Sequence, residues 1–547
     1  MNSFGVDAVP LTQDKNTIDA ARDPLEAGHL KVGLMGRSIR SAAIVLVSQG
    51  GKFTLQFVAL IAMTRLVSPN DFGVFGVVTA ITGFGLLFKD GLSSGIVQRE
   101  SLTQAQCSGL FWLSMLVGSA LALVTCVAAP FLSSLYKLPV LTPLLIAIAL
   151  ANLVAYSGSQ HLAVLRRTMR FDALAVIDQL AMFFSVAIGI VCALRGCGVW
   201  SLAVQQICFS VFIAIGAWVA SSWRPGRYQS NCGLKSLVLY GKDVATSDVA
   251  TYTMRNVDNL LIGWACGVGP LGFYDRAYTL MMIPLTQLLA PLGGLGNTML
   301  SRLQNDRERY RSYAESIISI SCGLGMPVAV YLCVGAHRFI PVVLGQAWLG
   351  SVPLMQALAP AAVADAFILG ITTILLSRGK SKEFFLYRVS AATLAVLAFF
   401  AGVHWGPLGV AVAVALSRVV AVFIVLRLCL SDPQIPVRFT HIRRAATAPL
   451  LAAIGAGLIV VQCDKIIGAA GNPVVSLAIS AVGYGLLYLV IWALLPQGAR
   501  TIAQIAAIGF NNKKLGSLQA ASNATAATSD PNAELEAGKI EELSSSS

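Results

Sequence analysis

Long apolar stretches separated by short polar breaks recur along most of the chain. Each stretch can cross a hydrocarbon core of about 30 Å, which takes roughly 20 helical residues. The pattern predicts fourteen transmembrane helices, over residues 41–64, 74–97, 108–131, 140–163, 172–194, 198–220, 242–264, 271–299, 313–335, 352–376, 384–403, 407–429, 445–464 and 472–495. The connections between these spans are short, so they leave no room for an external catalytic domain.

Composition places the chain in the same class. Of its 547 residues, 56% are apolar and 12% are charged, and the mean hydropathy is +0.73. Soluble globular domains hold about 45–50% apolar and about 25% charged residues. The sequence therefore predicts an all-α polytopic membrane protein and excludes a water-soluble one.

The basic residues indicate an orientation. Lys and Arg gather in alternate loops, for example at 166–170, 302–311 and 438–444, and are sparse in the loops between them. Because basic loops stay in the cytoplasm, both termini are expected there. Topology thus explains much of the net charge of +13, so the charge favours the lipid bilayer as the partner of these loops and not nucleic acid.

Two pairs of segments share recurring features, which indicates an internal duplication. "LVSPNDFGVF" and "CGVGPLGFYDR" pair Pro69 with Pro270 at an offset of 201, and "LTPLLIAIALA" and "SVPLMQALAPA" pair Pro143 with Pro353 at 210. Six spans is an even number, so the two copies enter the membrane from the same side as parallel repeats. Spans thirteen and fourteen lie outside the duplication.

The resulting division has five parts. We expect a polar cytoplasmic N-terminal extension without a cleavable signal peptide, two lobes of six spans, a final pair of spans, and a polar, disordered cytoplasmic tail. The boundaries are 1–35, 36–230, 231–430, 431–498 and 499–547.

Motifs for enzyme, metal or nucleotide chemistry are missing from the sequence. The eleven cysteines form no CxxC pair, and the five histidines lack metal-ligand spacing. Cys192 and Cys197 bracket a tight turn and could form a disulfide, although cysteines in spans more often serve as small apolar residues. The run "SRGKSK" around Lys380 lacks the first glycine of a phosphate-binding loop, where Ile374 stands. We expect no enzyme activity and no cofactor.

Polar residues at helical spacing mark the first span of each repeat. Gln49, Lys52 and Gln56 share one face of span one, and Asp248, Tyr252, Arg255 and Asn259 share one face of span seven. An ionisable residue near mid-membrane costs about 2.5–3.5 kcal/mol on insertion scales, so it normally faces a wet or protein-lined interior. Lys52 and Arg255 predict an anion site in a central cavity, because an arginine can donate hydrogen bonds to two phosphate oxygens at once.

A structural alternative remains open for these charges. Arg255 and Asp258 stand three residues apart and could neutralise each other, whereas Lys52 has no carboxylate at helical spacing. Asp258, Asp365, Asp248 and Asp178 are the candidates for ion coupling. Each acid could instead be a local structural partner.

The chain resembles a known family in three segments: "LLIGWACGVGPLGFYDRAYTLMMIPL", "RLVSPNDFGVFG" and "SRLQNDRERYRSY". They look like the Wzx-type polysaccharide flippases of the multidrug/oligosaccharidyl-lipid/polysaccharide exporter superfamily, in its exopolysaccharide and lipopolysaccharide branch. The resemblance runs from about Gly36 to Pro496, and the polar extensions depart from it.

That resemblance implies two six-helix lobes plus two helices, and transfer of an undecaprenyl-diphosphate-linked oligosaccharide across the bacterial inner membrane by alternating access. The family's cationic cavity maps by motif position onto Lys52 and Arg255. The implied partners are a polysaccharide polymerase and a chain-length regulator beside a monomeric transport unit.

Three alternatives stay open. The chain could be a small-molecule antiporter of the same superfamily, a peptidoglycan-precursor flippase, or a scaffold for polymer synthesis that transports nothing.

Overall fold

The structure is a computed structural model that describes residues 34–98, 102–229, 233–432, 435–467, 472–495 and 498–499. At some helical positions it describes the backbone alone; these include residues 34–47, Asp248 and Arg255. The predicted N-terminal extension lies almost entirely outside the described residues, and so does the predicted C-terminal tail.

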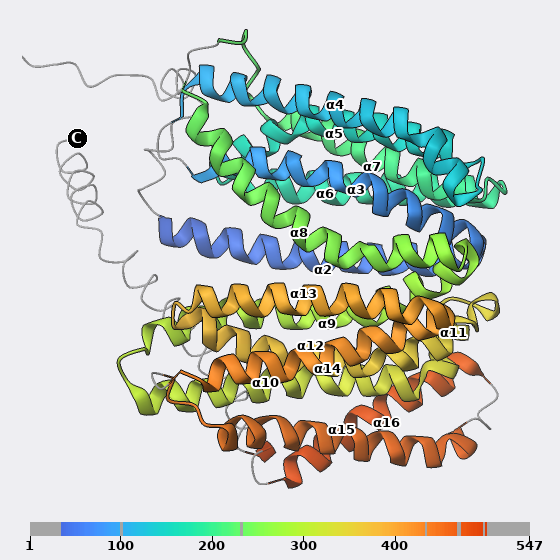
Figure 1. Cartoon of the computed structure of the whole chain (residues 1–547), viewed down its shortest axis with the longest axis vertical. Helices are drawn as coiled ribbons and strands as arrows, with labels where there is room; N and C mark the ends of the chain where they lie inside the picture. The colour runs from blue at the N-terminus through green and yellow to red at the C-terminus, as the bar shows by residue number, and fades with distance from the viewer. Residues whose placement is uncertain are drawn as a thin grey trace, which may run out of the picture. The chain divides into compact units, whose positions relative to one another are not determined.

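Each of the fourteen predicted spans coincides with one long helix, so the predicted all-helical fold is confirmed (Figure 1). The long helices are α2 (Leu34–Leu66), α3 (Pro69–Gln98), α4 (Gln104–Tyr136), α5 (Leu141–Arg167), α6 (Phe171–Leu194), α7 (Val199–Ala220), α8 (Lys235–Ala265), α9 (Val268–Arg302), α10 (Arg307–Val334), α12 (Ser351–Ser377), α13 (Ser381–Gly402), α14 (Gly406–Leu430), α15 (Phe439–Ile467) and α16 (Pro473–Leu494). A short helix, α11 (Ala336–Val343), and two 3-10 turns, η2 (Gln346–Trp348) and η3 (Val403–Trp405), complete the described elements.

Apolarity is uneven among these helices. By length and composition, 11 stretches of the described chain could cross a membrane, with α13 and α14 counted as one. Helices α2 and α8, in which many positions are described by their backbone alone, are not among these stretches.

The repeat is visible in the helix starts. Two-residue connections join α2 to α3 and α8 to α9, and Pro143 and Pro353 are each the third residue of their helix, α5 and α12. A proline fits there because the first N–H groups of a helix have no intrahelical acceptor. The longer connection before α12 contains α11 and η2, which accounts for the growth of the sequence offset between the two matches.

The first of two compact units contains residues 1–283, 335–361 and 388–421. Within it α3 packs on α8, α5 and α4, α6 packs on α7, and α2 packs on α6 (Figure 1). Its buried core includes Leu110, Phe111, Val164 and Trp223.

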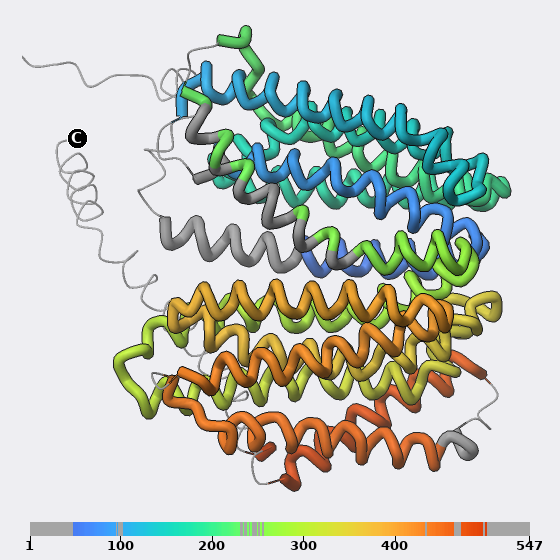
Figure 2. Tube along the Cα trace, viewed as in Figure 1, coloured from blue at the N-terminus to red at the C-terminus, as the bar shows by residue number. Residues whose placement is uncertain are grey.

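The second unit contains residues 284–334, 362–387 and 422–547. In it α15 packs on α10 and α16, as the trace in Figure 2 also shows. Tyr484, Tyr488 and Trp492 recur every fourth residue of α16 and are buried, and the Tyr488 hydroxyl donates to the Gly323 carbonyl at 2.8 Å. The predicted division into two lobes at residues 230 and 231 stays a prediction.

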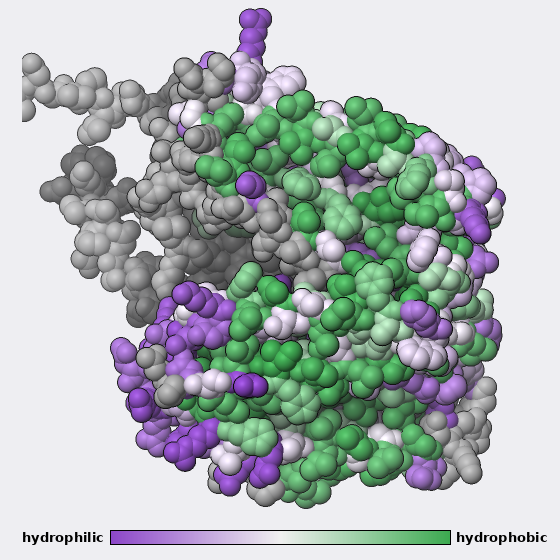
Figure 3. Space-filling model, viewed as in Figure 1, coloured by the Kyte–Doolittle hydropathy of each residue, from purple (hydrophilic) through white to green (hydrophobic). Residues whose placement is uncertain are grey.

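The visible surface of both units fits a lipid surrounding. In Figure 3 hydrophobic side chains cover much of the length of the helices, and hydrophilic ones gather toward their ends. Leu123, Val127, Phe423 and Leu458 are among the large apolar side chains that stay exposed. A helix must present such residues outward where hydrocarbon, not water, is its solvent.

Helices α3 and α9 cross at their N-terminal ends through two glycines. A Cβ built on Gly73 would lie 1.7 Å from the Val268 carbonyl oxygen, and one built on Gly272 would lie 1.9 Å from that of Pro69. The contact is reciprocal, since each glycine meets the residue four positions before the other. Only a residue without a side chain lets the two backbones approach this closely.

The Trp348 side chain packs at the same end of the first unit. Its side chain is fully buried, its indole N–H donates to the Thr64 carbonyl at 2.7 Å, and the rings of Phe72 and Phe273 meet it edge-on at 5.3 and 6.1 Å. Ser351 Oγ donates to the Phe273 carbonyl at 2.9 Å. The connection containing α11 and η2 is therefore anchored to the ends of α2, α3 and α9.

Replacing either crossing glycine should destabilise the protein. Gly73→Ala or Gly272→Ala forces backbone movement, and overpacking of this kind costs about 1–3 kcal/mol. Thermal unfolding of the purified protein in detergent would measure the loss. Gly85→Ala, on the same helix as Gly73 but with open space around its Cβ, is the control and should be neutral. Equal stability of all three variants would contradict the crossing.

Cysteine labelling tests the orientation. Cys192 and Cys197 are both free thiols, and Cys197 is exposed in a loop predicted to face outward. In intact cells a membrane-impermeant maleimide should label a variant retaining only Cys197, and should not label one retaining only the buried Cys107. Burial raises the pKa of the Cys266 thiol, so its labelling should be slow at neutral pH and faster as pH rises. Labelling of Cys197 only after permeabilisation would reverse the predicted topology.

Candidate functional site

The cation predicted on α2 has an acidic partner on α6. Lys52 Nζ lies 2.7 Å from Asp178 Oδ2, and the two side chains keep 30% and 41% of their surface exposed. One residue along, Gln179 Nε2 donates to the Ser48 carbonyl at 2.5 Å and packs over Gly51. The structure thus joins a predicted binding residue and a predicted ion-coupling residue in one ion pair at the α2–α6 contact.

The other two residues of the α2 stripe surround this pair along the helix. Gln49 is exposed and Gln56 is half-buried. Positions 49, 52 and 56 share a face because the whole segment is helical. The stripe therefore consists of a lysine, whose charge is compensated by Asp178, with one neutral amide side chain on each side of it.

Asp258 is bonded within the α8–α9 pair. Its side chain is only 4% exposed, Tyr274 donates its hydroxyl to Asp258 Oδ2 at 2.8 Å, and the Asn259 backbone N–H donates to Oδ1 at 2.9 Å. Both carboxyl oxygens therefore have donors. Tyr274 connects this acid to the helix that follows it.

Tyr252 is held against α3. Its hydroxyl donates to the Thr79 carbonyl at 2.7 Å, and its ring meets Phe84 edge-on at 4.9 Å. Gly83 makes room for it, since a Cβ there would lie 1.9 Å from the Tyr252 oxygen. This tyrosine is consequently part of the α3–α8 interface.

The remaining predicted residues are not brought together. Arg255 and Asp248 belong to α8, but their side chains lie outside the described residues, and Asn259 is half-buried. Asp365 is half-buried on α12, in the second unit. Ligand, coupling and structural roles for these residues remain predictions.

Two partners escaped the sequence analysis. Asp178 was considered as a coupling acid, but its pairing with Lys52 spans 126 residues and follows no local spacing. Tyr274 stood in the motif that carried the family resemblance, but nothing in that motif connects it to Asp258. Helical periodicity shows which residues share a face and not which helix lies opposite.

The loop that resembles part of a phosphate-binding motif has local partners. It follows the helix α12 and not a strand, Lys380 pairs with Asp432, and the Arg378 guanidinium lies 4.1 Å from the centre of the Tyr310 ring. The hydrogen bond to Asp432 raises the pKa of Lys380, so the lysine is a cation at physiological pH. Among the described residues no cluster of three or more His, Cys, Asp or Glu could hold a metal ion.

Known proteins share the fold and the sequence pattern. The family described as "Polysaccharide biosynthesis protein" matches residues 62–353, more than half of the chain. The chain is 24% identical over 378 residues to the lipopolysaccharide biosynthesis protein WzxC of Escherichia coli (strain K12), covering 67% of this chain and 75% of that protein. It is 24% identical over 321 residues to the succinoglycan biosynthesis transport protein ExoT of Rhizobium meliloti (strain 1021), covering 58% and 65%.

Among solved structures, the lipid II flippase MurJ in an inward closed conformation superposes with a TM-score of 0.67 at 13% identity. The superposition covers 84% of this chain and 99% of that one. A multidrug resistance MATE family transporter in an inward-facing conformation superposes with a TM-score of 0.50 at 14% identity, covering 68% and 92%. At these identities the likeness concerns the fold alone.

The fourteen long helices in the described part of the chain define a multi-pass membrane protein with the fold shared by MurJ and the MATE transporters. Within that class, the chain belongs to the polysaccharide biosynthesis family. The resemblance predicted from the sequence is therefore confirmed.

Removing the donor to Asp258 should cost stability. Tyr274→Phe leaves a buried carboxyl oxygen without its hydroxyl donor, and an unsatisfied buried polar group costs about 1–3 kcal/mol. The midpoint of thermal unfolding in detergent should fall accordingly. Tyr313→Phe removes a hydroxyl from a side chain that is 46% exposed and serves as the control. Equal midpoints for the two variants would contradict the hydrogen bond.

Proposed function

We propose that the chain is a flippase that moves an undecaprenyl-diphosphate-linked oligosaccharide from the cytoplasmic to the periplasmic leaflet of the bacterial inner membrane. The product would enter exopolysaccharide or lipopolysaccharide assembly. Membership of the polysaccharide biosynthesis family supports this, as do relatives named for lipopolysaccharide biosynthesis and succinoglycan transport. A polymerase and a chain-length regulator are the expected partners of a monomeric unit.

The half-exposed ion pair between Lys52 and Asp178 is the observation that carries the proposal. A lysine that is already compensated can stay in the membrane without substrate, because pairing offsets the cost of the bare charge. The lipid-linked diphosphate carries more negative charge than a single carboxylate, so it can displace Asp178 as the partner of Lys52. Substrate binding then exchanges one partner of Lys52 for another.

This exchange would also connect binding to an ion gradient. Once the diphosphate occupies Lys52, the Asp178 carboxylate loses its cation and lies beside an added negative charge. Both changes favour proton uptake by the acid. The proton would be taken up from the periplasm, and its loss to the cytoplasm after the diphosphate has been released outside would restore the ion pair. Asp178 is therefore the first choice among the coupling acids, ahead of Asp248, Asp258 and Asp365.

Arg255 is the proposed second cation. Asp258, the carboxylate nearest to it along α8, already accepts hydrogen bonds from Tyr274 and Asn259. Since Asp258 has other donors, its own stability does not require Arg255. Gln49, Gln56 and Asn259 would bind sugar hydroxyls, whereas the Tyr252 hydroxyl is occupied by Thr79 and its role would be to position α8.

The test is mass spectrometry of lipid-linked saccharides extracted from cells. Cells lacking the protein should accumulate one undecaprenyl-diphosphate oligosaccharide, and wild type should clear it. Losing a charged hydrogen bond costs about 1.5–3 kcal/mol, so Lys52→Gln and Arg255→Gln should each slow clearance roughly 10- to 100-fold. Asp178→Asn should bind substrate but lose the dependence of clearance on the proton gradient.

Arg195→Gln is the matched control, because Arg195 is an exposed cation in a predicted external turn. It should clear the saccharide like wild type at equal protein level. Normal clearance by Lys52→Gln and Arg255→Gln would rule out the cationic site. Continued polymer export without any accumulation in the deletion strain would rule out the flippase itself and favour the small-molecule antiporter.

A further inference from the structure

A groove runs between α6 and α7 of the first unit. It has a volume of about 510 Å³, within the range of roughly 300–1,000 Å³ typical of ligand sites. Its floor is formed by Ile177, Ala181 and Gly216. A Cβ on Gly216 would lie 2.8 Å from Ile177 Cγ2. The absence of a side chain at Gly216 therefore lets Ile177 pack closely against α7.

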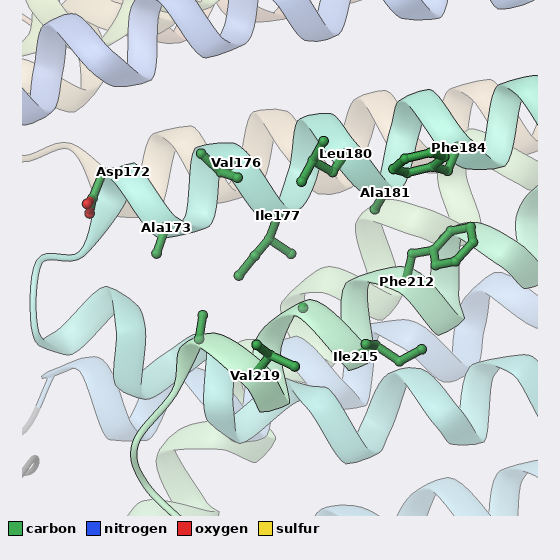
Figure 4. A pocket seen from close by; sticks show the side chains of 12 residues that line it. Asp172, Ala173, Val176, Ile177, Leu180, Ala181, Phe184, Phe212, Ile215 and Val219 are labelled. Atoms are coloured by element: carbon green, nitrogen blue, oxygen red, sulfur yellow. The ribbon is translucent and has the colours of Figure 1, made fainter.

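The walls of the groove are apolar and exposed. On α6 Val176 and Leu180 are 56% and 51% exposed, and on α7 Ile215 and Val219 are 54% and 79% exposed. Figure 4 shows these side chains on both sides of the groove, with Phe184 and Phe212 at one end. Those two rings lie 5.9 Å apart and limit the groove there.

The opposite end of the groove is charged. Asp172 lines it, exposed and without an ion pair in the described part of the chain. Arg170 is also exposed and donates one N–H to the carbonyl of Ala220, another lining residue, at 2.8 Å. Its other N–H groups have no hydrogen-bond partner in the part of the chain that the structure describes. The Arg170 guanidinium thus lies beside the mouth at Ala220, the Asp172 carboxylate lines the mouth, and no ion pair joins them in the part of the chain that the structure describes.

The dimensions match one leaflet of a membrane. From Asp172 to Phe184 the groove follows α6 for about 18 Å at about 1.5 Å per residue. Half of a hydrocarbon core is about 15 Å. The charged mouth lies at the end of α6 and α7 that the basic loops place in the cytoplasm, so a chain lying in the groove would belong to the inner leaflet.

We propose that the groove between α6 and α7 binds one zwitterionic glycerophospholipid of the phosphatidylethanolamine type. The Arg170 guanidinium takes the phosphate through its unused N–H groups. The Asp172 carboxylate takes the primary ammonium, and one acyl chain lies along the apolar walls toward Phe184 and Phe212. A purely anionic headgroup would leave Asp172 facing a like charge, so the pair of charges selects for the amine. The proposal does not rest on the transport function.

The test measures lipids that stay bound to the purified full-length protein, by native mass spectrometry and by lipid extraction. Wild type should retain phosphatidylethanolamine in preference to phosphatidylglycerol. Arg170→Gln should lower retention of phosphatidylethanolamine at least 5-fold. Asp172→Asn should lower the ratio of phosphatidylethanolamine to phosphatidylglycerol at least 3-fold. Arg166→Gln, which removes an exposed arginine at the end of α5, is the matched control and should behave like wild type.

A third variant separates lipid binding from folding. Ala173→Phe fills the groove without changing a charge and should reduce retention of both lipids, even if Arg170→Gln unfolds because the Ala220 carbonyl loses its donor. Preference of wild type for phosphatidylglycerol would overturn the proposal, as would equal losses in Arg166→Gln and Arg170→Gln. Enrichment of isoprenyl phosphates over phosphatidylethanolamine would assign the groove to the substrate's tail instead.

Discussion

Compensation of charge and polarity inside hydrocarbon is the constraint on which this structure depends. In water an unpaired lysine or aspartate costs little, but in a membrane each such group requires a partner. Lys52 has Asp178, and Asp258 has Tyr274. Each bond joins two different helices, α2 to α6 and α8 to α9. These polar residues therefore link neighbouring helices as well as marking where a ligand could bind.

The sequence predicts the helices well because the membrane simplifies the problem. Hydrocarbon thickness sets the length of a span, and all fourteen predicted spans are helices in the structure. The prolines matched between the repeats, Pro143 and Pro353, both lie in the first turn of their helices. The short helix α11 was missed, since its eight residues are far too few to register as a span.

The sequence does not predict the contacts of the candidate site as well as it predicts the helices. Periodicity correctly places Gln49, Lys52 and Gln56 on one helical face, and Tyr252 on α8. It cannot identify Asp178 as the partner of Lys52, because their pairing depends on how α2 and α6 cross. Nor does it show that the Tyr252 hydroxyl is occupied by a carbonyl of α3. Side chains on one stripe can therefore differ in whether they are available to a ligand.

The reciprocal crossing of Gly73 and Gly272 has a consequence for how the two repeats could diverge. After a duplication, most positions of one copy can change without regard to the other, because they pack within their own repeat. These two glycines touch the backbone of the opposite repeat, so neither can gain a side chain unless the other helix withdraws. Substitution at either of these two sites, which lie 199 residues apart in the sequence, therefore depends on the position of the other helix. At this crossing, the substitutions that one half of the chain can accept are limited by the other half.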